Sequence, residues 1–264
     1  MKTRKFGVII GALFFILTSL SCSKSDSPQP ADTRTSAEVE ADFQALDLTA
    51  GTHDFAILSK VSNEWNFRLI VPESASATNK RPLIVNLHGA SGGDTNAHKT
   101  TSCYAEPGFA SLDPIILSPN AGAQLWISTR NQEMVLTLIE LSVKYLPVDT
   151  SKIVVTGYSN GGNGAWFFSE TQPSIFSAGI PMASSYNTFG TDGNARKINT
   201  PLYEIHGEND EHFPLEETQA WIEATNNAGS NVTLKVAEGL THNEPCEYVP
   251  YVENAADWLV NEIW

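Results

Sequence analysis

Short apolar runs recur along the chain, and most of them are followed by a segment whose apolar residues repeat at helical spacing. Apolar runs of this length, rich in β-branched residues, predict strands. The predicted strands are residues 55–59, 66–71, 83–87, 115–117, 153–156, 176–181, 202–205 and 232–236. The predicted helices are residues 94–104, 131–146, 160–172, 215–227 and 251–263.

This alternation of strands and helices predicts an α/β domain with a mostly parallel sheet and helices on both faces. The first two strands are close enough in sequence to form an antiparallel pair. Residues 159–210 hold only a predicted helix, strands and a connecting loop. No large lid domain fits there, so we expect an open cleft at the sheet edge.

The N-terminal segment reads as an export signal. Lys2, Arg4 and Lys5 precede the apolar residues 6–20, which are too few to span a membrane comfortably. Residues 1–21 resemble a bacterial lipoprotein signal, which implies lipidation of Cys22; an ordinary secretory signal with an incidental cysteine is the alternative. Residues 22–42, rich in Ser, Pro, Thr, Asp and Ala, predict a flexible tether. Residues 43–264 are expected to form the folded domain. The protein would then be anchored to a membrane only through this lipid, in the periplasm or at the cell surface.

The charge of the chain narrows its partners. Apolar residues make up 41% and charged residues 17%, and the formal net charge is −14. All charged residues in the signal are basic, so its removal would make the net charge of the remaining chain more negative. Such a surface repels nucleic acid and anionic membranes, so neutral substrates are expected.

The most informative stretch is the strand that runs into Gly157-Tyr158-Ser159-Asn160-Gly161 and then into a predicted helix. A sharp turn between strand and helix lifts the serine hydroxyl above the sheet edge, where a base and a substrate can reach it. The flanking glycines are needed because a Cβ would clash in so tight a turn. The stretch therefore predicts a nucleophilic serine at Ser159.

An acidic residue and a histidine follow in chain order, each just after a predicted strand. Asp210 follows strand 202–205, and His242 follows strand 232–236. Because ligands of an open α/β sheet bind beyond the carboxyl ends of its strands, these residues are expected to converge with Ser159. Two alternatives stay open: Glu208 could replace Asp210, and His242 could be a surface residue.

These residues predict a Ser-His-Asp triad. Ser159 would attack a carbonyl, His242 would accept the proton and return it to the leaving group, and Asp210 would orient the imidazole. The backbone N–H groups of Ala90 and Asn160 would bind the oxyanion. His88 is expected to be a structural loop residue. The sequence holds no metal-ligand spacing such as His-x-x-x-His, so neither a metal nor another cofactor is expected.

Two aromatic residues are candidates for substrate binding. Trp126 stands between a strand end and the long helix 131–146, where it could stack on a sugar or an aromatic acyl group. It could equally pack in the core. Tyr158 could line the pocket or only pack beneath it.

Two cysteines stand near the predicted site. Cys103 follows the candidate oxyanion loop, and Cys246 comes shortly after His242. Export would permit a disulfide between them, which would join two loops of the site. Two buried free thiols are the alternative.

With these motifs the chain resembles the α/β-hydrolase superfamily, and most of all its secreted esterase branch. That branch holds feruloyl and acetyl-xylan esterases, polyhydroxybutyrate depolymerase-like proteins and related predicted peptidases. The matching stretches are residues 87–89, 148–153, 157–166, 176–181 and 206–210. The resemblance implies the α/β-hydrolase fold without a large lid domain. The residues after His242, Asn243-Glu244-Pro245-Cys246, depart from the small residues of the family and leave the pocket shape there unpredicted.

The leading hypothesis is a serine carboxylesterase that hydrolyses carbohydrate-linked acyl esters of the acetyl or feruloyl type through an acyl-enzyme. Its substrate would be a neutral ester attached to a polysaccharide. A peptidase or polyester depolymerase with the same triad is one alternative. A non-catalytic glycan-binding protein on a hydrolase scaffold is another, but the intact order of the three residues argues against it.

Overall fold

The computed structural model describes residues 33–264, which form one compact unit. The predicted signal at residues 1–21, the lipidation site Cys22 and most of the predicted tether lie outside the described residues. No helix within residues 33–264 has both the length and the apolar character that a membrane crossing requires.

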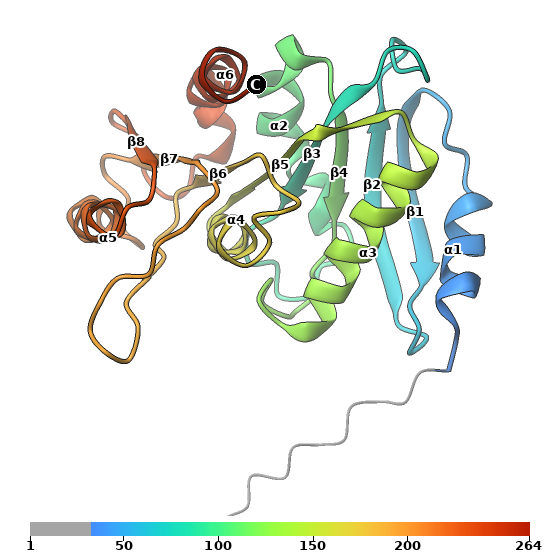
Figure 1. Cartoon of the computed structure of the whole chain (residues 1–264), viewed down its shortest axis with the longest axis horizontal. Coiled ribbons are helices and arrows are strands. Elements are labelled where there is room, and N and C mark those ends of the chain that lie inside the picture. The colour runs from blue at the N-terminus through green and yellow to red at the C-terminus, as the bar shows by residue number, and fades with distance from the viewer. Residues whose placement is uncertain (1–32) are drawn as a thin grey trace, which may run out of the picture. The chain divides into compact units, whose positions relative to one another are not determined.

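Within these residues, eight strands form a single sheet in the order β1-β2-β4-β3-β5-β6-β7-β8 (Figure 1). β2 pairs antiparallel with β1 and with β4, and all other neighbours are parallel, which confirms the predicted sheet. The strands are β1 Gly51–Leu58, β2 Glu64–Val71, β3 Arg81–Leu87, β4 Ile115–Pro119, β5 Val148–Tyr158, β6 Ala178–Met182, β7 Leu202–Gly207 and β8 Val232–Ala237.

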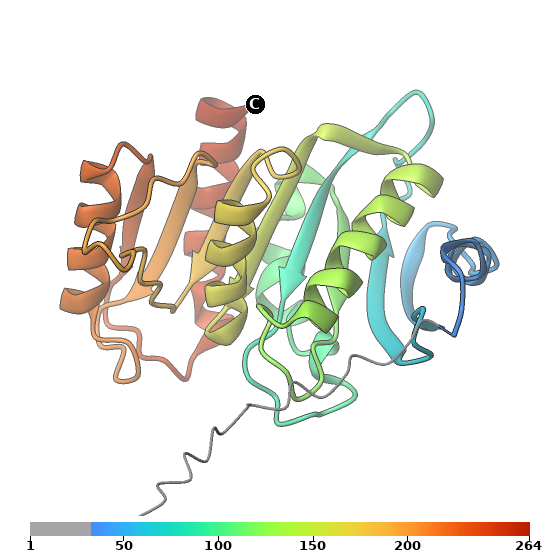
Figure 2. The ribbon, with the colours of Figure 1, turned by 60° about the horizontal axis from the view of Figure 1, so that its bottom comes forward.

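Helices cover both faces of the sheet (Figure 2). Because side chains alternate along a strand, β3 sends Leu83, Val85 and Leu87 into one buried cluster and Ile84 into the other. The first face carries α1 Ser36–Gln44, α3 Thr129–Tyr145, α4 Asn160–Thr171 and α5 Leu215–Asn227; the second carries α2 Ser102–Gly108 and α6 Val249–Trp258. A π-helical turn, Leu259–Ile263, extends α6.

The folded domain begins earlier than the composition of the tether segment suggests. Helix α1 starts after Thr35, whose side chain accepts the N–H of Glu38 at 3.2 Å, while the Glu38 carboxylate accepts the N–H of Thr35 at 2.7 Å. Phe43 is fully buried and stacks on Phe67 at 6.1 Å. The predicted tether boundary at residue 42 is therefore wrong. The Thr-x-x-Glu capping box was the sequence signal for this helix.

The helix predicted over residues 94–104 is also wrong in its first half. The Asp94 carboxylate accepts the backbone N–H of Asn96 at 2.9 Å, a local turn that competes with helix formation. A short 3-10 turn at Ala97–Lys99 follows, and α2 begins only at Ser102.

Strands β3, β5, β7 and β8 run parallel, so their carboxyl ends share one edge of the sheet. The loop at His88 follows β3, Ser159 follows β5, Asp210 follows β7 and His242 follows β8. Between Ser159 and Asp210 the chain forms α4, β6, a loop and β7, with no separate lid domain among these described residues. The fold thus assembles the predicted residues at one edge.

Candidate active site

Ser159 occupies a strained turn between β5 and α4. Its backbone has φ 57° and ψ −120°, a region that residues with a Cβ rarely adopt. A Cβ on Gly157 would lie 2.3 Å from the carbonyl oxygen of Gly161, and one on Gly161 would lie 2.0 Å from that of Leu87. The turn therefore tolerates only glycine at both positions, and it presents the Ser159 hydroxyl at the sheet edge.

The structure brings Ser159, His242 and Asp210 into one hydrogen-bonded series. His242 Nε2 lies 2.9 Å from Ser159 Oγ, and His242 Nδ1 lies 2.8 Å from Asp210 Oδ2. Since a carboxylate only accepts, Nδ1 carries the proton and Nε2 is free to accept the serine proton. His242 and Asp210 are buried, with 9% and 5% of their surface exposed.

Asp210 is held ionised by its surroundings. Burial would raise its pKa, but hydrogen bonds from His242 and from the backbone N–H groups of Phe213 and His212 outweigh burial, and the pKa lies below its usual range. The alternative acid, Glu208, instead accepts the backbone N–H of Gly239 at 2.9 Å. The structure therefore pairs the histidine with Asp210 rather than Glu208.

The backbone of His242 is fixed from two sides. The Tyr158 hydroxyl donates to the His242 carbonyl, and the Glu211 carboxylate accepts the His242 N–H at 3.0 Å. Tyr158 also lines the pocket, with its ring centroid 5.6 Å from that of His242. Tyr158 thus combines both roles left open by the sequence, and Glu211 is a residue that the sequence reading missed.

The loop after β3 passes beside Ser159. His88 Nε2 accepts the N–H of Ala121 at 3.0 Å, so its proton is on Nδ1, which donates to the Gly89 carbonyl at 2.6 Å. Burial lowers the pKa of His88, which keeps this structural ring neutral. Ala90 lines the pocket with Ser159, and Asn160 opens α4. Within residues 33–264, the backbone N–H groups of Ala90 and Asn160 have no hydrogen-bond acceptor.

Trp126 does not offer a stacking surface, so that expectation is wrong. The side chain is fully buried, and its Nε1–H donates to the His88 carbonyl at 2.9 Å. Helix α4 packs directly against it, because a Cβ on Gly164 would lie 2.8 Å from the Trp126 Cβ. Trp126 therefore supports the loop that carries Ala90.

A disulfide joins Cys103 to Cys246. Cys103 belongs to α2, and Cys246 belongs to the 3-10 turn Pro245–Tyr248 that follows His242. The bond thus ties the helix on one side of the pocket to the histidine loop on the other.

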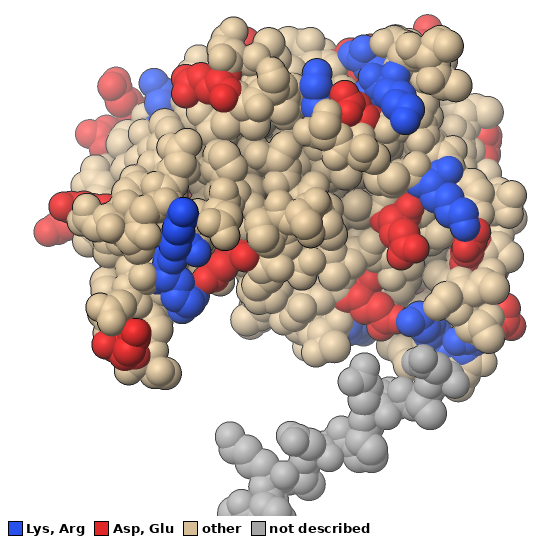
Figure 3. All heavy atoms as spheres, in the orientation of Figure 1, with Lys and Arg blue, Asp and Glu red and all other residues tan. Residues whose placement is uncertain are grey.

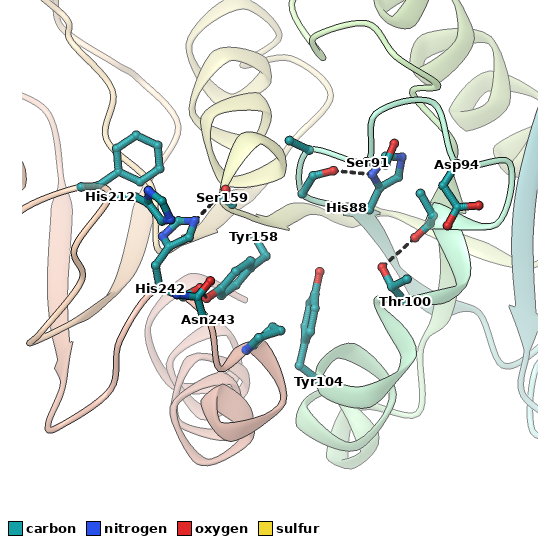
Figure 4. Close-up of a pocket in the computed structure, with 15 residues that line it drawn as sticks. His88, Ser91, Asp94, Thr100, Tyr104, Tyr158, Ser159, His212, His242 and Asn243 are labelled. Carbon is teal, nitrogen blue, oxygen red and sulfur yellow. Dashed lines mark hydrogen bonds between the residues drawn. The ribbon is translucent and has the colours of Figure 1, made fainter.

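One pocket of about 760 Å³ surrounds Ser159, within the usual size range of small-molecule sites. In Figure 4, His212, His242 and Asn243 stand on one side and His88, Ser91, Asp94 and Thr100 on the other, with Tyr158 and Tyr104 between them. The remaining lining residues are Gly89, Ala90, Ala97, Phe213 and Pro245. None of the residues that line this pocket is Lys or Arg, and Asp94 is the one carboxylate among them.

His212 is a further pocket residue that the sequence reading missed. Its ring lies edge-on to that of His242, with the centroids 4.6 Å apart, and Phe213 lies 5.3 Å from the same ring. Their position two and three residues after Asp210 was the available signal. Within the described part of the chain, no group of three or more His, Cys, Asp or Glu side chains is placed to hold a metal ion.

Comparison with known sequences identifies a family. The sequence model of the dienelactone hydrolase family matches residues 67–262, a span that includes the whole pocket. No curated protein sequence matches the chain.

Similar solved structures include two esterases and a peptidase. A thermostable esterase is 20% identical with a TM-score of 0.64, over 79% of this chain and 62% of that one. Esterase 2 of Thermogutta terrifontis, bound to propionate, is 19% identical with a TM-score of 0.64, over 80% and 94%. The Pyrococcus horikoshii acylaminoacyl peptidase is 17% identical with a TM-score of 0.58, over 84% and 43%. These likenesses establish the α/β-hydrolase fold. The chain spans less than two thirds of the first structure and less than half of the peptidase.

Proposed function

This chain belongs to the dienelactone hydrolase family of serine hydrolases, and we propose that it is an exported carboxylesterase that removes acyl groups from carbohydrate-linked esters. The observation that carries the proposal is the series Ser159–His242–Asp210, with hydrogen-bond distances of 2.9 Å and 2.8 Å, in the wall of the pocket. This arrangement matches the geometry that a nucleophile, a base and an orienting acid require.

In the first half of the reaction, Ser159 Oγ attacks the ester carbonyl while His242 Nε2 takes the hydroxyl proton. Asp210 keeps the imidazole in the tautomer that can accept this proton and stabilises the resulting cation. His242 then gives the proton to the alcohol oxygen, the C–O bond breaks, and the acyl group stays on Ser159. In the second half, water attacks the acyl carbon while His242 Nε2 takes a water proton. The bond from the acyl carbon to Ser159 Oγ then breaks, His242 returns the proton to Ser159 Oγ, and the carboxylic acid leaves.

The tetrahedral intermediates of both halves carry a negative oxygen. The backbone N–H groups of Ala90 and Asn160, which lack an acceptor within residues 33–264, are the donors that we assign to it. Such donors are effective because they are fixed before the charge develops, and loss of one costs about 3 kcal/mol of barrier. The N-terminus of α4 adds a favourable dipole at the same place.

The pocket chemistry supports a neutral, hydroxyl-rich substrate. Tyr104 and Tyr158 are nearly buried and suit the acyl group, while the exposed Asp94, Thr100 and Asn243 offer acceptors and donors to sugar hydroxyls. Absence of Lys and Arg from the lining disfavours a substrate with a carboxylate near the ester. On the face in Figure 3, basic side chains stand in small groups near acidic ones, which also favours neutral over polyanionic partners.

Export and anchoring through Cys22 are part of the proposal. The basic and apolar order of residues 1–21 supports it, and so does the Cys103–Cys246 disulfide, because disulfides persist mainly in oxidising compartments. Metabolic labelling of the full chain with a fatty acid tests the anchor. Label is expected on the native chain and absent from Cys22→Ser; label on both variants, or on neither, would exclude an acyl chain on Cys22.

Fluorophosphonate labelling tests the chemistry. The purified protein should take one adduct on Ser159, and Ser159→Ala should lose both the adduct and the hydrolysis of p-nitrophenyl acetate. Ser151→Ala, which changes an exposed serine at the start of β5, is the matched control and should keep both. Undiminished turnover by Ser159→Ala would refute the assignment.

A substrate panel then separates the candidate activities. Acetylated and feruloylated oligosaccharides are expected to be better substrates than a matched hemisuccinate ester. The peptidase alternative has a structural neighbour in its favour, the acylaminoacyl peptidase. A matched ester and anilide pair decides it, because an amide also needs protonation of its leaving nitrogen. Faster anilide cleavage would replace the esterase proposal, and tight glycan binding without any Ser159 adduct would point to the binding protein.

A further inference from the structure

Two buried ionisable side chains stand on β7 behind Asp210, and the reaction steps above do not use them. Glu204 and His206 are both fully buried, and Glu204 Oε1 lies 3.3 Å from His206 Nδ1. They are two positions apart on a strand, so they project from the same face of the sheet. Burial of ionisable groups is costly unless they are paired and hydrogen-bonded, so a carboxyl group and an imidazole here call for a function.

The number of protons that Glu204 and His206 share follows from which of their atoms donate and which accept hydrogen bonds. His206 Nε2 lies 2.7 Å from the carbonyl oxygen of Phe213, which can only accept, so Nε2 carries a proton. His206 Nδ1 and Glu204 Oε1 face each other, and two lone pairs would repel. One further proton therefore lies between them, and the pair as a whole is neutral.

The neighbours of Glu204 place that proton on the histidine. Glu204 Oε2 accepts the indole N–H of Trp166 at 2.7 Å, and such donors stabilise a carboxylate. On the other side, His206 Nε2 lies 3.9 Å from Asp210 Oδ2, the oxygen that also accepts from His242. A positive imidazole thus stands between two carboxylates.

The direction of the pKa shift of His206 agrees with this order of charges. Burial alone would lower its pKa, but the hydrogen bond and charge of Glu204 outweigh burial and raise it, with help from Phe213 and Asp210. Burial raises the pKa of Glu204, and this rise opposes the ion pair. The hydrogen bond and charge of His206 and the hydrogen bonds from Trp166 and the Ser184 N–H act in the other direction and favour the carboxylate. The remaining titratable neighbour is Tyr248, which stays neutral because burial raises its pKa.

We propose that Glu204 and His206 form a buried ion pair that positions Asp210 and sets the basicity of His242. His206 anchors the Phe213 carbonyl, and the N–H of Phe213 in turn donates to Asp210 Oδ1 at 2.8 Å. The positive ring also offsets part of the negative field that Asp210 exerts on His242. This inference rests on the proposed catalytic role of Asp210.

Glu204→Gln separates the charge from the shape. A glutamine can accept from Trp166 through its oxygen and donate to His206 Nδ1 through its amide nitrogen, so the shape is kept while His206 becomes neutral. The amide nitrogen cannot accept the Ser184 N–H that now lies 3.4 Å from Glu204 Oε1, so this one long hydrogen bond is lost as well. Without the positive ring, protonation of His242 is favoured, so the acid limb of the kcat/KM profile should move to higher pH. The other titratable groups beside His242, which are Tyr158, Glu211 and His212, are unchanged by this substitution. We expect kcat to fall about fivefold, the scale of one lost hydrogen bond, with KM unchanged because the pair does not line the pocket.

Two readouts and one control test the proposal on the full chain. ¹⁵N-histidine NMR at neutral pH should show His206 protonated on both nitrogens in the native protein and only on Nε2 in Glu204→Gln. The control is Glu170→Gln, which removes a carboxylate that pairs with Arg196 at 2.5 Å near the end of α4. It should leave the His206 signals and the acid limb unchanged.

Each result decides a separate point. A neutral His206 in the native protein would overturn the ion pair, and an unmoved acid limb in Glu204→Gln would overturn the positioning role. If Glu204→Gln does not fold, Trp166→Phe takes its place, because it removes one hydrogen-bond donor to Glu204. Trp166→Phe should move the acid limb in the same direction. An unmoved acid limb would again overturn the proposal. Loss of Ser159 labelling in the native protein would instead refute the proposed function, and the NMR result would stand apart from it.

Discussion

Replacement of Tyr158 by phenylalanine tests how backbone contacts orient the imidazole of His242. The Tyr158 hydroxyl donates to the His242 carbonyl, and the Glu211 carboxylate accepts the His242 N–H on the other side of the same residue. The imidazole must reach Ser159 and Asp210 at once, so small rotations of this backbone lengthen one of the two bonds. Tyr158→Phe removes the first support and leaves the ring in place.

The size of the effect follows from burial. Tyr158 is 7% exposed and His242 is 9% exposed, so little water can replace the lost donor. A buried hydrogen bond of this kind contributes about 1 kcal/mol net, and a stranded acceptor raises the cost toward about 3 kcal/mol. If the loss falls on the aligned state, kcat/KM decreases about 5- to 150-fold. Glu211 is exposed, so Glu211→Gln should have the smaller effect.

The assay is kcat/KM for p-nitrophenyl acetate across pH, with both single variants and the double variant. The pH limbs should keep their positions, because no charge beside the imidazole changes in Tyr158→Phe. Coupling between the two substitutions is expected, since both act on one residue. Tyr203→Phe, at a buried tyrosine that packs on Trp258, is the control and should retain native kcat/KM. Equal kcat/KM for Tyr158→Phe and Tyr203→Phe would refute the reasoning.

Substitutions at the acid, at the disulfide and in α1 have definite expected outcomes. Asp210→Asn should lower kcat about 10⁴-fold, whereas Glu208→Gln should not, and comparable losses in both would show that the acid is misassigned. The pKa of Asp210 is lowered in the folded protein, so its ionised form stabilises the fold at pH values above the ordinary carboxyl pKa. This stabilisation is lost as the pH falls through the lowered pKa. The free energy of unfolding of Asp210→Asn should lack this pH-dependent contribution. Replacement of Cys103 and Cys246 by serine opens a loop with a sequence separation of 143 and should lower the free energy of unfolding in urea by up to about 5 kcal/mol. Phe43→Ala should cost about 3–5 kcal/mol in the same assay, and a negligible loss would mean that α1 is not part of the cooperative domain.

The sheet and the site residues were predictable because both depend on local patterns. Parallel strands bury both faces and read as continuous apolar runs, and their carboxyl ends share an edge. Ser159, Asp210 and His242 each follow such a run, so their proximity needs no knowledge of packing. The glycines of the turn are equally local, because only glycine fits at Gly157 and Gly161.

The features that the sequence left open depend on contacts between distant segments. Trp126 could have faced either the pocket or the core, and the closeness of α4 at Gly164 decides for the core. The disulfide required the spatial proximity of α2 and the histidine loop, which no spacing reveals. The supports of His242 come from Tyr158 and Glu211, which are far from it in sequence.

The strained backbone at Ser159 positions its hydroxyl group but lowers the thermal stability of the fold. Its left-handed φ of 57° places the hydroxyl but costs roughly 1–3 kcal/mol for a residue with a Cβ. Glycine avoids this strain, but it loses more conformational entropy on folding, which costs about 0.5–1 kcal/mol. If the strain lies at the upper end of its range, relief of the strain exceeds this entropic cost. Ser159→Gly should then melt above both the native protein and Ser159→Ala. Laboratory selection for thermal stability alone would thus favour loss of Ser159, the proposed nucleophile, so a screen for more stable variants must also select for turnover at every round.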